Sequence, residues 1–75
     1  MDNNILIQDP EMIKNTLLYQ YYPGLGKQQT QKLVDEMYKI PQFADGVLRI
    51  SGKTTLVIKK RFSDFLKWKN EQYLR

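Results

Sequence analysis

The pattern of side chains between residues 27 and 38 constrains the fold more than any other feature of the sequence. Side chains that can pack in a protein core recur there at positions i, i+3, i+4 and i+7, the spacing that lines one face of a helix. They are Thr30, Leu33, Val34 and Met37. Amides and charges fill the opposite face at the same spacing: Gln28, Gln31, Lys32 and Asp35. The segment is therefore predicted to be an amphipathic helix that begins near Lys27.

The residues before it predict another helix, from about residue 10 to residue 21. Asp9-Pro10 is typical of a helix start, because Asp is a favoured N-cap and Pro fits the first helical position. Ile13, Leu17 and Tyr21 then recur at four-residue spacing. Pro23-Gly24 ends this helix, so a short turn separates it from the next one.

A β-hairpin is predicted after the amphipathic helix. The strand-like runs are Val47 to Ile50 and Thr54 to Ile58, with Ser51-Gly52-Lys53 between them. A three-residue turn pairs Ile50 with Thr54 and Leu48 with Leu56, and we expect Gly52 to take a left-handed conformation there. That register separates two sets of side chains: Leu48, Ile50, Leu56 and Ile58 on one face, and Val47, Arg49, Thr55 and Val57 on the other.

The remaining segments predict a loop and a last helix. Residues 38–46 have neither period and contain Pro41 and Gly46, so they are predicted to be a loop anchored by Phe43. From about Lys60 the helical spacing returns, in Phe62, Phe65, Leu66, Lys69 and Tyr73. The predicted fold class is mainly α with a β-hairpin, in the order helix, helix, hairpin, helix.

The chain length allows one domain. A chain of 75 residues buries only ~60% of the surface that its unfolded form exposes, which leaves a small core. We expect residues 1–75 to form a single domain, with residues 1–8 as a flexible or strand-like N-terminal segment. No apolar run approaches the ~18 residues of a membrane-spanning helix, and the N-terminus does not have the pattern of a signal peptide.

Composition excludes several kinds of chemistry. The sequence has no cysteine and no histidine, so disulfides, zinc fingers, Cys nucleophiles and His general bases are excluded. Gly52-Lys53-Thr54 copies the end of a phosphate-binding P-loop, but Val47 stands where that motif needs glycine. No two carboxylates are placed as an acid–base pair. We therefore expect that the protein is not an enzyme and that it has neither a cofactor nor a metal site.

Charge is divided unequally along the chain. Residues 1–26 carry Lys14 against Asp2, Asp9 and Glu11, a net charge of −2, whereas residues 27–75 carry eleven Lys and Arg against five Asp and Glu, a net charge of +6. Basic charge thus gathers in the amphipathic helix, the hairpin and the last helix. This distribution favours a polyanionic partner.

Two predicted helices joined by a tight turn, followed by a hairpin, suggest a helix-turn-helix with a wing that binds DNA. Side chains that can contact bases or phosphates lie on three of these segments. They are Lys27, Gln28, Gln31 and Lys32 on the helix, Arg49, Lys53 and Thr54 on the hairpin, and Lys60 within Lys59-Lys60-Arg61. The alternative is that the helix presents only a solvated face and the hairpin an ordinary exposed turn. The tyrosines and Trp68 either fill the core or, in part, face a protein partner.

Several stretches together resemble the small excisionase-type proteins, winged-helix relatives of the MerR DNA-binding domain. The resemblance covers about residues 10–68. It rests on Leu25 to Val34, Phe43, Val47 to Ile50, Leu56 to Ile58 and Phe62 to Leu66. Two departures from the pattern of these proteins stand out. The first is Ser51, an extra residue in the hairpin loop. Lys59 replaces a proline, which we expect to loosen the start of the last helix.

The resemblance implies an architectural DNA-binding protein in the cytoplasm of a bacterial host cell. Such a protein bends the double-stranded DNA of an attachment site and steers a tyrosine-type integrase toward excision of a mobile element. Several copies would bind side by side along the DNA, or as a dimer. A transcriptional regulator of the same fold is an alternative. A protein-binding module, such as a phage inhibitor that uses Trp68 and the tyrosines, is another.

Overall fold

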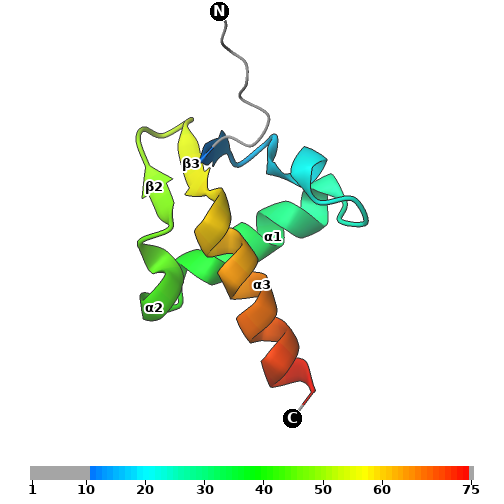
Figure 1. Cartoon of the computed structure of the whole chain (residues 1–75). Coiled ribbons are helices and arrows are strands. Elements are labelled where there is room, and N and C mark those ends of the chain that lie inside the picture. Colours follow the sequence, from blue (N-terminus) through cyan, green and yellow to red (C-terminus); the bar gives the residue numbers. More distant parts are fainter. Residues whose placement is uncertain (1–10, 75) are drawn as a thin grey trace, which may run out of the picture.

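The computed structural model of the chain describes residues 11–74, which form three α-helices, one short 3-10 helix and a three-stranded antiparallel sheet (Figure 1). The elements are β1 (Met12–Lys14), η2 (the 3-10 helix, Leu18–Tyr21), α1 (Lys27–Tyr38), α2 (Pro41–Ala44), β2 (Val47–Arg49), β3 (Thr55–Ile58) and α3 (Lys59–Tyr73). The fold is therefore mixed α and β rather than mainly α. The predictions for residues 1–8 and for a helix start at Asp9-Pro10 lie outside the described residues.

The first predicted helix is wrong. Its residues form β1, which pairs with β3 through Ile13 and Val57, and then the single turn of η2. Of the predicted stripe, Ile13 is buried from β1, but Leu17 is 47% exposed and Tyr21 38%. Leu18, beside that stripe, is fully buried instead. The pairing of β1 with an exposed edge of β3 outweighs the helical spacing, as tertiary contacts commonly do over local propensity.

The hairpin has the predicted register. In the sheet, whose order is β1-β3-β2, Leu48 lies opposite Leu56 and Arg49 opposite Thr55. The N–H of Ile50 donates to the carbonyl of Thr54 at 3.0 Å, which closes the three-residue turn. Of the two faces that this register separates, the one with Val47 and Val57 covers the core, and both of these side chains are buried.

The conformation expected for Gly52 is wrong. Among the described glycines, positive φ occurs at Gly24, at 102°, in the turn between η2 and α1. The hairpin turn instead contains a bond from the N–H of Thr54 to the carbonyl of Ser51, the i to i+3 pattern of a β-turn.

The amphipathic helix and the last helix are confirmed. α1 begins at Lys27 as predicted and buries Thr30, Val34 and Met37. α3 begins directly after β3, and its first residue, Lys59, donates its backbone N–H to the carbonyl of Glu11 at 2.9 Å. This hydrogen bond links the start of α3 to the residue before β1, and it uses an N–H that a proline would lack.

The predicted loop at residues 38–46 contains one helical turn, α2, with Pro41 at its start. The prediction that Phe43 anchors this segment to the core is confirmed, because its side chain is only 6% exposed. The ring of Phe43 meets the rings of Phe65 and Trp68 at centroid distances of 5.6 and 5.7 Å. Trp68, suggested as a partly exposed contact for a partner, thus packs against the core and is partly buried.

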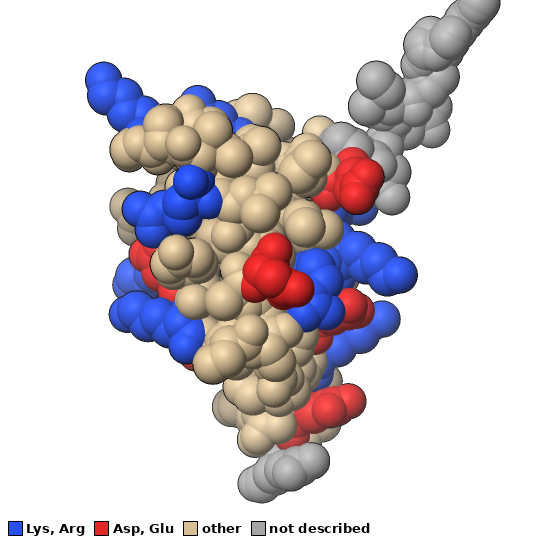
Figure 2. All heavy atoms as spheres, turned by 90° about the vertical axis from the view of Figure 1, so that its left-hand side faces the viewer, with Lys and Arg blue, Asp and Glu red and all other residues tan. Residues whose placement is uncertain are grey.

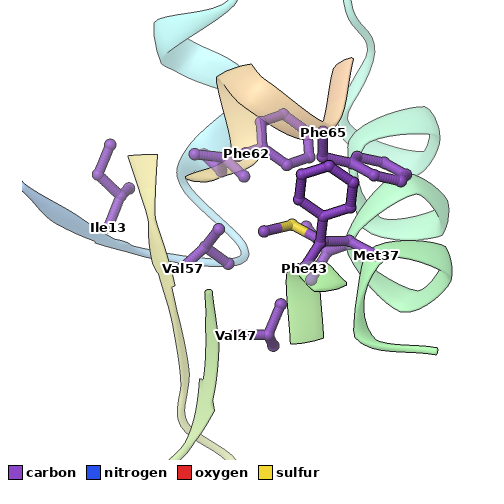
Figure 3. Packing of buried hydrophobic residues seen from close by; sticks show 9 residues of the cluster. Ile13, Met37, Phe43, Val47, Val57, Phe62 and Phe65 are labelled. Carbon is purple, nitrogen blue, oxygen red and sulfur yellow. The ribbon is translucent and has the colours of Figure 1, made fainter. Parts of the chain in front are cut away.

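The core lies between the sheet and the helices. Figure 3 shows Ile13, Val47 and Val57 on the strands and Phe62 and Phe65 on α3, with further apolar side chains from α1 and α2 between them. Near the turn before α1, the ring of Tyr22 contacts Phe62 edge-on at 5.1 Å. Its hydroxyl lies 2.7 Å from the Ser63 hydroxyl and donates to the carbonyl of Lys59. These contacts tie the turn to α3 and so fix the entry to α1.

Candidate nucleic-acid interface

The polar face of α1 gathers four of the predicted site residues. Lys27, Gln28, Gln31 and Lys32 line one shallow hollow on this helix. All four point outward because the apolar side chains on the other face hold that face against the core, and only Gln31 is partly buried. The structure therefore brings two ammonium groups and two amides together over the first half of α1.

The first turn of α1 is open to an anion. Gly26 is the N-cap and has no side chain that could accept from the helix, and the turn contains no acidic residue. Because the first N–H groups of a helix have no intrahelical acceptor, an uncapped N-terminus favours a negatively charged ligand. Lys27 stands in that turn. The N-terminal end of α1 thus combines free donors with a positive side chain.

A second hollow lies between α1 and the hairpin, with a volume of about 240 Å³. It admits a group of several heavy atoms, since a water molecule occupies about 30 Å³ in the liquid. α1 contributes Asp35 and Tyr38, and the hairpin contributes Arg49 and Lys53. The alternation of the strands explains the placement, because Arg49 lies on the same face as buried Val47 and so faces α1.

Arg49 is held over an aromatic ring. Its guanidinium carbon lies 5.5 Å from the centroid of the Tyr38 ring, within the range of a cation–π contact. Tyr38 is 44% exposed, so the stacked pair lies at the surface. The contact restrains the long Arg49 side chain beside the helix and leaves its N–H groups available.

The cations of the molecule divide into paired and unpaired groups. Arg61 pairs with Asp45 at 3.3 Å and with Asp64 at 3.8 Å, and Lys69 pairs with Glu36 at 2.8 Å. In contrast, the four cations of the two hollows form no salt bridge with a described residue. These four are Lys27, Lys32, Arg49 and Lys53. Lys14, Lys39, Lys60 and Lys67 also form no salt bridge with a described residue, but they lie outside both hollows. What distinguishes the surface of α1 and the hairpin is that four such cations line its two hollows.

Two predicted residues lie outside both hollows. Lys60 is exposed on α3, and its neighbour Arg61 belongs to the fold, since it also donates to the backbone carbonyl of Gln42 and lies over the ring of Phe43. Thr54 is partly buried in the hairpin turn, where its backbone is hydrogen-bonded to Ser51. Thr55, one residue later, lines the hollow in its place.

Five residues with polar side chains that line the second hollow were not predicted as site residues: Asn15, Thr16, Asp35, Tyr38 and Thr55. Asp35 had a signal, because it continues the polar stripe of α1 one turn beyond Lys32. Asn15 and Thr16 had none, since they were assigned to a helix that does not form. They follow β1, where the N–H of Asn15 donates to the carbonyl of Thr55 and brings the segment beside the hairpin.

The molecular surface shows an uneven spread of charge. Figure 2 views the side on which β2 and α2 lie, and basic side chains stand mainly toward its two margins. Much of the upper area between them is uncharged, and single acidic side chains interrupt the lower area. The apolar face of the sheet contributes to the uncharged surface of the molecule, since Met12 is 46% exposed and Ile50 61%.

No protein-family model, curated protein or solved structure matches the chain. Within residues 11–74, no helix has the length and apolar character needed to cross a bilayer. The same residues contain no group of three or more carboxylates placed to hold a metal ion.

Proposed function

We propose that the protein is a sequence-specific DNA-binding protein related to the winged helix-turn-helix type, in which α1 enters the major groove and the hairpin acts as the wing. The 3-10 helix η2 stands where that motif has its first helix. The observation that carries the proposal is the gathering of four unpaired cations and two amides on α1 and the hairpin. Cations without internal partners are free to replace the counterions of a phosphate backbone. Amides at the same surface add the donors and acceptors that read base edges.

The dimensions of α1 fit this role. Its 12 residues make a helix of about 18 Å, and the major groove of B-DNA is about 12 Å wide, enough to admit a helix. With the polar face of α1 in the groove, Gln28 and Gln31 face the base edges, where Gln pairs with adenine. Lys27 and the free N–H groups of the first turn are placed for a phosphate.

The hairpin would contact the DNA backbone beside the helix. Arg49 and Lys53 stand across the second hollow from α1, so they reach phosphates next to the groove that α1 occupies. With the resemblance in sequence to excisionase-type proteins, this arrangement supports an accessory role in recombination. The protein would bend attachment-site DNA and direct a tyrosine-type integrase toward excision, with several copies along the DNA.

A mobility-shift titration tests this proposal. The protein is titrated onto duplex DNA from the attachment region of its mobile element and onto random duplex of the same length. We expect stepwise shifts on the attachment DNA at lower protein concentration than on the random duplex. Equal affinity for the two duplexes would refute sequence-specific binding, and no shift on either at low salt would refute DNA binding altogether.

A double variant tests whether α1 reads the sequence. Gln28→Ala combined with Gln31→Ala removes both amides and leaves every charge in place. We expect the preference for attachment DNA to fall by at least about tenfold, because each good bidentate contact contributes ~1–3 kcal/mol of discrimination. Binding to random duplex should change little. Gln72→Ala, an exposed amide near the end of α3, is the matched control and should leave the preference intact.

A further inference from the structure

The polar stripe of α1 ends on a carboxylate that has no partner among residues 11–74. Asp35 is exposed and lies one helical turn beyond Lys32, on the same face as Gln28 and Gln31. It lines the hollow between α1 and the hairpin together with Arg49 and Lys53, yet it forms no salt bridge or hydrogen bond with a described residue. The Asp35 carboxylate is paired with neither Arg49 nor Lys53, so it can accept a hydrogen bond from a donor outside the protein.

A phosphate is a poor ligand for this carboxylate, because like charges repel. The complementary group is a neutral hydrogen-bond donor, and in the major groove that donor is an exocyclic amino group. Asp accepts from the N4 amino group of cytosine, the contact typical of an acidic side chain on DNA. The guanidinium of Arg49, which lies over the Tyr38 ring, lines the same hollow as Asp35 and would meet the adjacent phosphate.

We propose that Asp35 is a specificity-determining residue of the α1 surface, which selects cytosine at one position of the site and weakens binding to unrelated DNA. This inference rests on the proposed DNA binding. The seven residues from Gln28 to Asp35 correspond to about 10.5 Å along the helix, or about three base-pair steps of 3.4 Å. Asp35 therefore reads a base pair about three steps from the one read by Gln28.

The substitution Asp35→Asn tests the inference, because it keeps the size of the side chain and removes its charge. Asn pairs bidentately with adenine rather than accepting from cytosine. In a selection from a randomised duplex library, we expect the wild type to enrich cytosine at one position and D35N to enrich adenine there. Affinity for random duplex should rise about threefold, the factor for two like charges about 7 Å apart in water.

Glu36→Gln is the matched control. It removes the same charge from the neighbouring position of α1, where Glu36 pairs with Lys69 away from the hollow. The E36Q variant should select the same bases as the wild type.

Three results would overturn the inference. If D35N selects the wild-type bases, or if the wild type binds duplex but selects no base at that position, the role of Asp35 is refuted and DNA binding stands. If the wild type binds no duplex at low salt, both proposals are refuted.

Discussion

Replacing Gly46 with alanine should destabilise the fold. A Cβ atom at Gly46 would lie 2.6 Å from the Cβ of Arg61 and 2.6 Å from the terminal methyl of Met37. The Arg61 Cβ is fixed to the backbone of α3 and cannot turn away. Gly46 cannot shift easily either, because its N–H donates to the carbonyl of Phe43 and its carbonyl accepts from the N–H of Ile58.

The magnitude follows from two opposing effects. Overpacking of a tight site costs ~1–3 kcal/mol, and the loss of glycine's freedom in the unfolded chain returns ~0.4–1 kcal/mol, since φ at Gly46 is not positive. The net loss is about 1–2 kcal/mol, which lowers Tm by ~5–15 °C in a domain of this size. Thermal unfolding followed by circular dichroism measures it.

Gly52→Ala is the control for that experiment. Gly52 lies in the exposed hairpin turn, nothing stands within 4 Å of an added Cβ, and its φ is not positive. We expect this variant to be as stable as the wild type or slightly more stable. The reasoning is refuted if Gly46→Ala is no less stable than the wild type, or if Gly52→Ala loses as much stability.

Two further predictions concern polar atoms in the core. Thr30 is fully buried and its hydroxyl has no hydrogen-bond partner among residues 11–74, so Thr30→Val should raise the free energy of unfolding by about 1 kcal/mol in urea titration; a loss of stability would show that the hydroxyl has a partner. Tyr22→Phe removes the hydroxyl that contacts Ser63 and the Lys59 carbonyl, and should cost about 1 kcal/mol in the same titration. If Tyr22→Phe has no effect in both the wild type and Ser63→Ala, that hydroxyl does not hold the turn to α3.

The parts of the fold that depend on local signals could be predicted from the sequence. α1 follows directly from its apolar spacing. The hairpin register follows from the turn length, because a three-residue turn keeps Val47 and Val57 on one face and Leu48 and Leu56 on the other. Phe43 was identified as an anchor because it is the only phenylalanine in a segment with Pro41 and Gly46. In each case the residues of one continuous segment are enough to predict its structure.

The parts that depend on contacts between distant segments could not be predicted. Ile13 has both helical and β-branched character, and only the free edge of β3, more than forty positions later, decides for a strand. The same error removed Asn15 and Thr16 from the candidate site, and it hid Tyr22 as the tie to α3. Arg61 belongs to the fold because Asp45 and Asp64 are close in space, which a run of three basic residues does not reveal.

The central claim, that the unpaired cations of α1 and the hairpin bind duplex DNA, is tested most directly by the salt dependence of that binding. Fluorescence anisotropy of a labelled duplex would be measured from about 50 to about 300 mM salt. If Lys27, Lys32, Arg49 and Lys53 each neutralise one phosphate, the slope of log K against log salt is about −3.6, a loss of ~600-fold over that range.

Lys32→Ala should reduce the slope to about −2.7, whereas Lys67→Ala, an exposed lysine on α3, should leave it unchanged. An affinity that does not change with salt, or the absence of binding at the lowest salt, would contradict the account.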